Sequence, residues 1–149
     1  MGHQIRPVQP EDLSVLVELC RKHAEYEQAS FDPTNKEYLL AKELFAENPK
    51  LFCMVVESNQ QLVGYASYTF DYSTWDAGMF LYLDCLYLET ECRGLGIGEE
   101  IMQKLKEIAQ QNNCVNIQWQ TPDFNTRAIK FYERVGGIGN NKVRFTWEV

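Results

Sequence analysis

The feature that most constrains the fold is an apolar, strand-like run that leads through three closely spaced glycines into an amphipathic helix. Met79–Leu88 is rich in aromatic and aliphatic residues, which is typical of a strand. Gly94-Leu95-Gly96-Ile97-Gly98 follows, and apolar residues then recur at helical spacing over Ile97–Gln111. A strand, a glycine loop and a helix in this order predict an α/β fold with a tight loop at the helix start.

The rest of the chain supplies the other layers of that fold. Strands are predicted at His3–Val8, Leu51–Glu57, Gln61–Phe70, Cys114–Gln120 and Lys142–Glu148. Helices are predicted from Pro10 onward, from a capping box at Thr34 to Asn48-Pro49, and over Asn125–Val135. Alternating strands and helices in the second half predict parallel pairing there, whereas the central hairpins are antiparallel. With no linker or repeat, we expect residues 1–149 to form one α/β domain with a mixed, mostly antiparallel sheet flanked by helices.

Composition and charge exclude several classes of function. The chain of 149 residues has a formal net charge of −7, which argues against a nucleic-acid surface because phosphates require clustered Lys and Arg. No apolar stretch is long enough to span a bilayer, so we expect no membrane association. Five scattered cysteines and two histidines form no metal-ligand pattern, so no metal is expected. Unpaired thiols of this kind fit a reducing cytoplasm.

The glycine loop has the character of an anion site. Glycines at the start of a helix let backbone N–H groups converge on an anion, and the helix dipole adds favourable potential. A Walker loop requires Gly-Lys-Ser/Thr, but Gly98 is followed by Glu99-Glu100. A dinucleotide fingerprint fails as well, because its third glycine would fall on Glu99. A tight turn that uses its glycines only for steric reasons remains the alternative.

Four separated segments carry a family resemblance. Arg93-Gly94-Leu95-Gly96-Ile97-Gly98 resembles the Q/R-x-x-G-x-G/A signature of the GNAT superfamily of N-acetyltransferases, and the order of elements agrees with that fold. Gly64-Tyr65-Ala66, Leu81-Tyr82-Leu83-Asp84 and Asn125…Phe131-Tyr132 resemble the diamine (spermidine/spermine) and thialysine acetyltransferase branch. The resemblance implies a sheet splayed at its central strands and an acetyl group supplied by acetyl-CoA.

The resemblance also implies where acetyl-CoA binds. Its expected contacts are Leu86, Tyr87, Leu88, Arg93, Gly94, Leu95, Gly96, Ile97, Gly98, Glu99, Asn125 and Arg127. Tyr132 is the expected general acid, because a phenol can protonate or hydrogen-bond the departing thiolate. From periodicity alone, Tyr132 could equally be an ordinary residue of an amphipathic helix, and Asn125 could be a plain N-cap.

The acceptor side is less well defined. Asp84, inside an apolar strand, is the expected carboxylate for binding or deprotonating an amine, although an exposed aspartate is an equal reading. Tyr26 and Glu27 match the acceptor-binding end of the first helix in the diamine branch, but Glu27 could also be a solvated charge. Cys85 stands where that branch has a second acid, so a primary amine other than a polyamine is at least as well supported.

These observations lead to one functional hypothesis and two alternatives. We expect an N-acetyltransferase that moves the acetyl group of acetyl-CoA directly to the primary amine of a small molecule, and, by analogy with the superfamily, a homodimer. The alternatives are a non-catalytic module that senses acyl-CoA and an enzyme that acetylates lysines of proteins or peptides.

Overall fold

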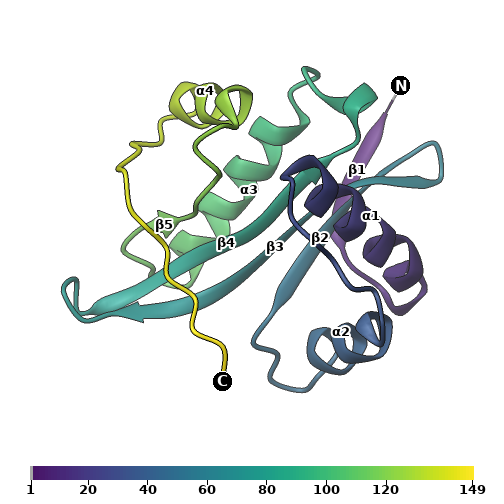
Figure 1. The fold of residues 1–149 in the computed structure, drawn as a ribbon, viewed down its shortest axis with the longest axis horizontal. Coiled ribbons are helices and arrows are strands. Elements are labelled where there is room, and N and C mark those ends of the chain that lie inside the picture. Colours follow the sequence, from purple (N-terminus) through teal and green to yellow (C-terminus); the bar gives the residue numbers. More distant parts are fainter. Residues whose placement is uncertain (1) are drawn as a thin grey trace.

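The computed structural model describes residues 2–149 and contains a five-stranded sheet with helices on both faces (Figure 1). The elements in chain order are β1 (His3–Pro7), α1 (Leu13–Tyr26), α2 (Lys36–Leu44), β2 (Phe52–Ser58), β3 (Gln61–Ser73), β4 (Gly78–Leu88), α3 (Ile97–Gln111), β5 (Ile117–Gln118) and α4 (Thr126–Arg134). Short 3₁₀ turns at Pro10–Asp12 and Thr90–Cys92 precede α1 and the glycine loop.

The strands lie in sequence order, β1-β2-β3-β4-β5, and their directions confirm the expected mixed sheet. The first four strands pair antiparallel. β5 runs parallel to β4, as strand–helix–strand connections favour. The β4–β5 ladder joins only Leu81 to Ile117 and Tyr82 to Gln118. Beyond Tyr82 the two chains separate, which confirms a splayed sheet.

Alternation along the strands divides the core between the two faces of the sheet. On β2, Met54 and Val56 pack with Ile101 and Leu105 of α3. Cys53 and Val55 point the other way and pack with α1 residues such as Leu16. Because side chains alternate along a strand, one run of apolar residues can fill both layers.

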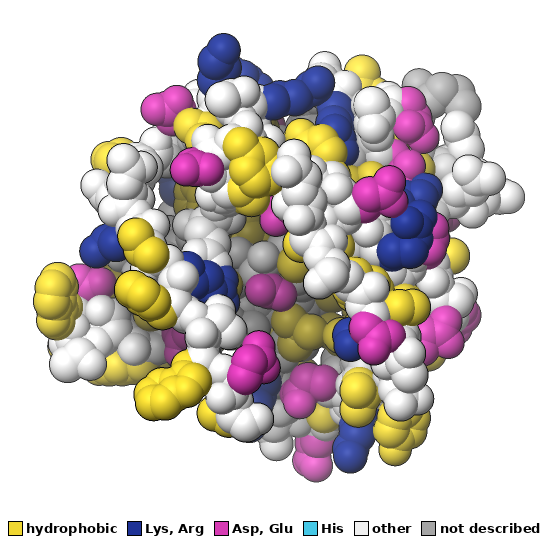
Figure 2. Space-filling model, in the orientation of Figure 1, with side chains coloured by type: hydrophobic (Ala, Val, Ile, Leu, Met, Phe, Trp, Pro, Cys, Tyr) yellow, Lys and Arg dark blue, Asp and Glu magenta, His cyan; other side chains and the backbone are white. Residues whose placement is uncertain are grey.

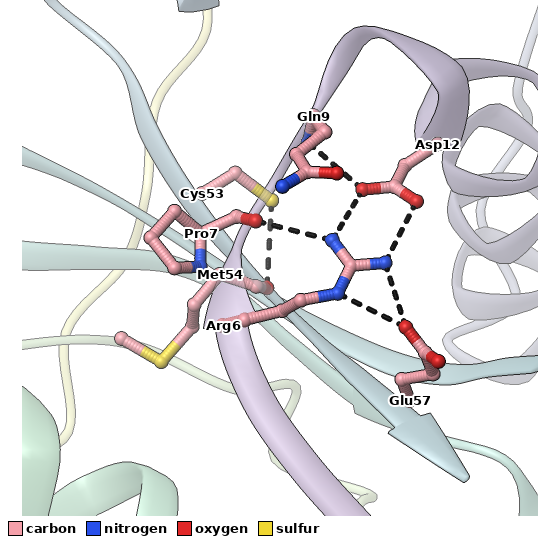
Figure 3. Close-up of polar contacts among 7 residues, drawn as sticks. All are labelled: Arg6, Pro7, Gln9, Asp12, Cys53, Met54 and Glu57. Atoms are coloured by element: carbon pink, nitrogen blue, oxygen red, sulfur yellow. Dashed lines mark hydrogen bonds and ion pairs between the residues drawn. The ribbon is translucent and has the colours of Figure 1, made fainter. Parts of the chain in front are cut away.

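A polar network anchors the start of α1 to the sheet (Figure 3). The Arg6 guanidinium donates to both carboxylate oxygens of Asp12, at 2.8 and 3.0 Å, and to Glu57 of β2 at 2.9 Å. The backbone N–H of Gln9 donates to the same Asp12 carboxylate at 2.8 Å. The hydrogen bond from Arg6 is the main reason that the pKa of Asp12 lies below its ordinary value. This network closes the turn between β1 and α1.

Three predicted elements differ from the structure. The strand expected at Cys114–Gln120 is reduced to Ile117–Gln118, because the N–H of Cys114 still bonds to the end of α3. The capping box expected at Thr34 is wrong: Asn35 is the N-cap, with φ +61° and no side-chain cap, and α2 begins at Lys36. The strand expected at Lys142–Glu148 is also wrong, since none forms between Ile138 and Val149. That C-terminal segment (yellow in Figure 1) is exposed and takes part in none of the strand pairings of the described chain.

Candidate active site

A cavity of about 680 Å³ opens where β4 separates from the chain beyond β5. The end of α1, the end of β4, the glycine loop and α4 surround it. Figure 2 shows a hollow near the middle of this face, and basic side chains gather above it over α4. Its volume lies within the range of small-molecule sites. The splay of the sheet therefore produces the cleft.

Most residues predicted for the site lie at this cavity. Ten of the twelve predicted acetyl-CoA contacts line it, and so do Tyr132, Tyr26 and Glu27. Leu95 and Ile97 do not: Leu95 is exposed to solvent, and the Ile97 side chain is buried in the core against α3 neighbours. At these two positions only the backbone can belong to the loop's anion site.

Backbone N–H and C=O groups on the side of β4 away from β3 face the cavity. The N–H of Glu89 donates to the carbonyl of Val63 on β3 at 2.8 Å. In an antiparallel ladder the groups that face the partner alternate, so the N–H groups of Leu86 and Leu88 point away from β3. The carbonyl of Leu88, on the same open side, accepts a hydrogen bond from Arg93 Nε at 2.9 Å. Two amides thus face a cleft where β5 offers no partner.

The glycine loop requires glycine for backbone geometry. Gly94 and Gly96 adopt φ +78° and +84°, a left-handed conformation that residues with a Cβ avoid. Gly96 is the N-cap of α3 and provides no side-chain cap, so the first N–H groups of that helix remain free for a ligand. Gly98 allows close packing, since a Cβ there would lie 3.0 Å from Phe131 Cζ on α4. Gly98 thus lets α4 pack closely on the start of α3. The first N–H groups of α3 have no side-chain cap and are available to a ligand.

Basic side chains concentrate at this cavity although the chain is acidic overall. Arg93, Arg127, Lys130 and Arg134 line it, against the acids Glu27 and Glu99. Three of these side chains lie on α4 at intervals of three and four residues, Arg127, Lys130 and Arg134, so they share roughly one face of the helix. Glu100, the other acid after the loop, is drawn aside by His3, whose Nε2 lies 2.8 Å from its carboxylate. The cavity is therefore suited to an anionic ligand.

Tyr132 lies on α4 at the inner end of the cavity. Its ring packs against Trp119 with centroids 5.3 Å apart and against Phe131. Burial, and then the charge of Glu27, raise the pKa of its hydroxyl to about 12. Tyr132 therefore keeps its proton at neutral pH and can act as a hydrogen-bond donor.

A bridge of side chains crosses the cavity from α1 to α4. The Tyr26 hydroxyl donates to Asn125 Oδ1 at 3.3 Å, and the Arg93 guanidinium lies 4.5 Å from the centroid of the Tyr26 ring. Asn125 also caps α4, because its Oδ1 accepts from the N–H of Ala128 at 3.4 Å. The N-cap reading of Asn125 is thus confirmed, and the residue also lines the cavity.

Asp84 lies on β4 at an irregular position of the sheet. Cys85 pairs with Ser67 and Leu83 with Tyr68, so Asp84 is the extra residue of a β-bulge. It is exposed and does not line the cavity. Its carboxylate accepts a hydrogen bond from the Cys85 thiol at 3.7 Å, and an alternating sequence pattern cannot reveal the extra residue of the bulge.

The sequence reasoning missed three residues of the cavity with titratable side chains. Lys130 and Arg134 line it, and their spacing from Arg127 along α4 was the available signal. His23 lines it beside Glu27, and the interval of four residues places both on one face of α1.

Among residues 2–149, no helix is long and apolar enough to cross a membrane. Within the same described residues, no cluster of three or more His, Cys, Asp or Glu side chains could hold a metal ion. All five cysteines are free thiols.

A splayed sheet, a glycine loop that ends in a helix, and a basic cleft define the architecture of an acyl-CoA-dependent transferase. Residues 16–137 match the acetyltransferase (GNAT) family, and the chain belongs to that family. It is an acetyltransferase of this class.

Curated relatives lie in the branch that the sequence motifs indicated. The chain is 34% identical over 140 residues to the thialysine N-epsilon-acetyltransferase of Sus scrofa, which covers 89% of this chain and 82% of the relative. It is 26% identical over 139 residues to the enzyme of the same name from Caenorhabditis elegans, covering 93% and 85% of the two chains. A spermidine/spermine N(1)-acetyltransferase-like protein of Homo sapiens is 32% identical over 106 residues, which are 66% of this chain and 15% of that protein.

Solved structures share the fold. A possible acetyltransferase from Clostridium difficile 630 superposes with a TM-score of 0.82 at 23% identity, covering 100% of this chain and 99% of that one. An aminoglycoside N-acetyltransferase in complex with CoA superposes with a TM-score of 0.81 at 15% identity, covering 99% and 95%.

Proposed function

We propose that this protein transfers the acetyl group of acetyl-CoA directly to a primary amine of a small molecule, with both substrates bound at once. The observation that carries the proposal is one cavity lined both by anion-binding groups and by Tyr132 and Glu27. Acetyl-CoA supplies an activated acetyl thioester and an anionic pyrophosphate. Residues of this chain would bind the phosphates, the acyl group and the acceptor amine.

The outer part of the cavity fits the phosphates. The free N–H groups at the start of α3 and the side chains of Arg93, Arg127, Lys130 and Arg134 would hold them. Backbone donors at a helix start and charged side chains together favour a diphosphate more than either alone. A cavity lined by apolar side chains alone would not supply these partners.

The inner part fits the acyl group and the departing sulfur. The N–H groups of Leu86 and Leu88 are available for the acyl oxygen, where one such donor is worth about 2.7–4 kcal/mol. The Tyr132 hydroxyl is available for the sulfur. Burial raises the pKa of the Cys85 thiol to about 12, so this thiol stays protonated and is a poor nucleophile. Direct transfer therefore fits better than an acetyl-cysteine intermediate.

The acceptor end is formed by Tyr26 and Glu27. A carboxylate there attracts an ammonium group, and the neighbouring Tyr26 ring lies 4.5 Å from the Arg93 guanidinium. The similarity to enzymes named thialysine N-epsilon-acetyltransferase supports a small primary amine such as thialysine. Asp84 remains a second proposed carboxylate, and its position at the bulge makes it the weaker one.

A thiol-release assay tests the proposal. Acetyl-CoA is offered with thialysine, lysine, spermidine, aminoglycosides and lysine peptides, and the acetylated products are identified by mass spectrometry. Acetylation of small amines is the expected result. Tight CoA binding without turnover on any amine would support a sensor instead. Turnover on peptides alone would support a protein lysine acetyltransferase.

We further propose that the partner of this chain is a second copy of itself. Four apolar residues alternate along the C-terminal segment, and each is more than three-quarters exposed: Val143, Phe145, Trp147 and Val149. Such a pattern is typical of a strand with one buried face. β5 is the edge strand of the sheet and is available for pairing. If two copies exchanged these C-terminal segments, the exposed apolar side chains and the free edge of β5 would both be covered.

Light scattering during gel filtration tests this proposal. We expect the mass of a dimer for the full chain and of a monomer after replacement of Val143, Phe145 and Trp147 by Ser. A full chain that elutes as a monomer at micromolar concentration would refute it.

A further inference from the structure

A hydrogen-bonded chain of three residues runs from the core to the acceptor end of the cavity. His23, in the last turns of α1, has its Nδ1 2.9 Å from the Tyr65 hydroxyl and its Nε2 2.9 Å from a carboxylate oxygen of Glu27. The imidazole stacks on the Tyr87 ring, with centroids 5.4 Å apart and an interplanar angle of 28°. Both ring nitrogens are therefore engaged, and the ring is held by packing.

The partners fix the direction of the hydrogen bonds. An ionised carboxylate can only accept, so Nε2 must carry the proton that it donates to Glu27. In a neutral imidazole Nδ1 is then the acceptor, and the Tyr65 hydroxyl 2.9 Å away is its donor. Tyr65 is 2% exposed, and burial raises the pKa of its hydroxyl, so the phenol retains the required proton. The order of donation is Tyr65 to His23 to Glu27.

Glu27 occupies the outer end of this chain, where it can meet a ligand. Its side chain is 32% exposed, whereas that of His23 is only 12% exposed. Glu27 lines the cavity, and its charge contributes to the raised pKa of Tyr132. The carboxylate therefore lies near the hydroxyl proposed to assist the departing sulfur. One of its oxygens is held by His23, and the other can accept from an ammonium group.

We propose that Tyr65 and His23 position the Glu27 carboxylate as the binding group for the ammonium of the acceptor amine. This inference rests on the proposed function. A free glutamate loses roughly 1.5–2 kcal/mol of rotamer entropy when it is fixed by a ligand. His23 fixes one carboxylate oxygen in advance, so that less ordering accompanies amine binding. His23 is thus a positioning residue, and it acts through Glu27.

The first test measures the tautomer and needs no substrate. Long-range ¹H–¹⁵N correlation spectra of the labelled protein near pH 7.5 distinguish Nε2–H from Nδ1–H. The chain has two histidines, so a His3→Asn variant assigns the His23 signals. We expect Nε2–H for His23, and loss of the fixed tautomer in Tyr65→Phe. An Nδ1–H tautomer, or a mixture like that of free imidazole, would overturn the proposed order of donation.

The second test is kinetic, with acetyl-CoA and thialysine as the probes. His23→Leu removes the donor and keeps an apolar side chain, whereas His23→Gln keeps an N–H that can reach Glu27. We expect His23→Leu to raise the KM for thialysine about tenfold, the lower limit for one hydrogen bond to a charged group, with the KM for acetyl-CoA unchanged. His23→Gln should restore most of the affinity.

A double-mutant cycle separates positioning from general stability. If His23 acts through Glu27, His23→Leu adds little to the effect of Glu27→Gln. Glu25→Gln is the matched control: it removes a carboxylate from the same helix, where Glu25 pairs with Arg21 at the surface. Equal rises in both KM values, or fully multiplicative effects in the cycle, would overturn the proposal. If the wild-type protein does not acetylate thialysine, the proposed acceptor fails, and the tautomer measurement still decides the hydrogen-bonded chain.

Discussion

Replacement of Tyr132 by Phe is the sharpest test of the proposed chemistry, because it removes one oxygen and little else. The ring packs against Trp119 and Phe131, and phenylalanine preserves those contacts. Stability and CoA affinity should therefore change little. Any loss of activity then reports on the hydroxyl.

The expected magnitude follows from the pKa of Tyr132, which burial raises to about 12. Full proton transfer from this phenol to a thiolate of pKa about 8.5 is uphill by roughly 3.5 units, or about 5 kcal/mol. A hydrogen bond donated to the developing charge stabilises it by about 1.5–3 kcal/mol. A hydrogen bond from the Tyr132 hydroxyl to the sulfur, without transfer of the proton, is therefore the lower-energy role. We therefore expect kcat to fall by about 10–150-fold, below the upper range of general acid catalysis.

Single-turnover thiol release, with both substrates saturating, measures this step. Thermal unfolding and CoA titration serve as controls for structure and donor binding. A kcat within twofold of the wild-type value would refute any role of the hydroxyl at the sulfur. A loss above a thousandfold would show that full proton transfer dominates, and that the raised pKa of Tyr132 is reversed in the complex.

Three further changes test other parts of the structure. Gly96→Ala forces a residue with a Cβ into φ +84°, so it should destabilise the fold by about 1–2 kcal/mol and weaken CoA binding, as measured by urea unfolding and calorimetry. Unchanged CoA affinity would argue against the loop as the phosphate site. Asp84→Asn should change kcat/KM for thialysine less than about threefold, because Asp84 lies outside the cavity; a larger loss would make it the acceptor carboxylate. Asp12→Asn should destabilise the fold by about 1–3 kcal/mol at neutral pH, since it weakens the bonds to Arg6 and Gln9. The pKa of Asp12 is lowered in the folded state, so this stabilisation is present above pH 3.8 and is lost as the pH falls through the lower folded value; urea midpoints of the two proteins should converge in acid.

Much of the fold could be read from the sequence because its signals are local. α3 runs over Ile97–Gln111 as predicted, since its apolar period and the glycines before it act within a few residues. The three central strands were predicted to within a few residues, for the same reason. The failures are non-local. Lys142–Glu148 has the alternation of a strand, but a strand also requires a hydrogen-bonded partner, and this segment pairs with none in the described chain.

The same division holds for the site. An anion site at the glycine loop could be proposed from sequence, because left-handed residues and free N–H groups at a helix start are properties of the local backbone. The bulge at Asp84 could not be predicted, because it depends on the register between β3 and β4. The link from His23 to Tyr65 joins residues 42 positions apart, and only the packing of α1 on the sheet brings them together. The sequence by itself determined the glycine loop at the start of α3 and led us to propose an anionic donor there. The tertiary structure decided which carboxylate lines the cavity, since that depends on contacts between distant segments.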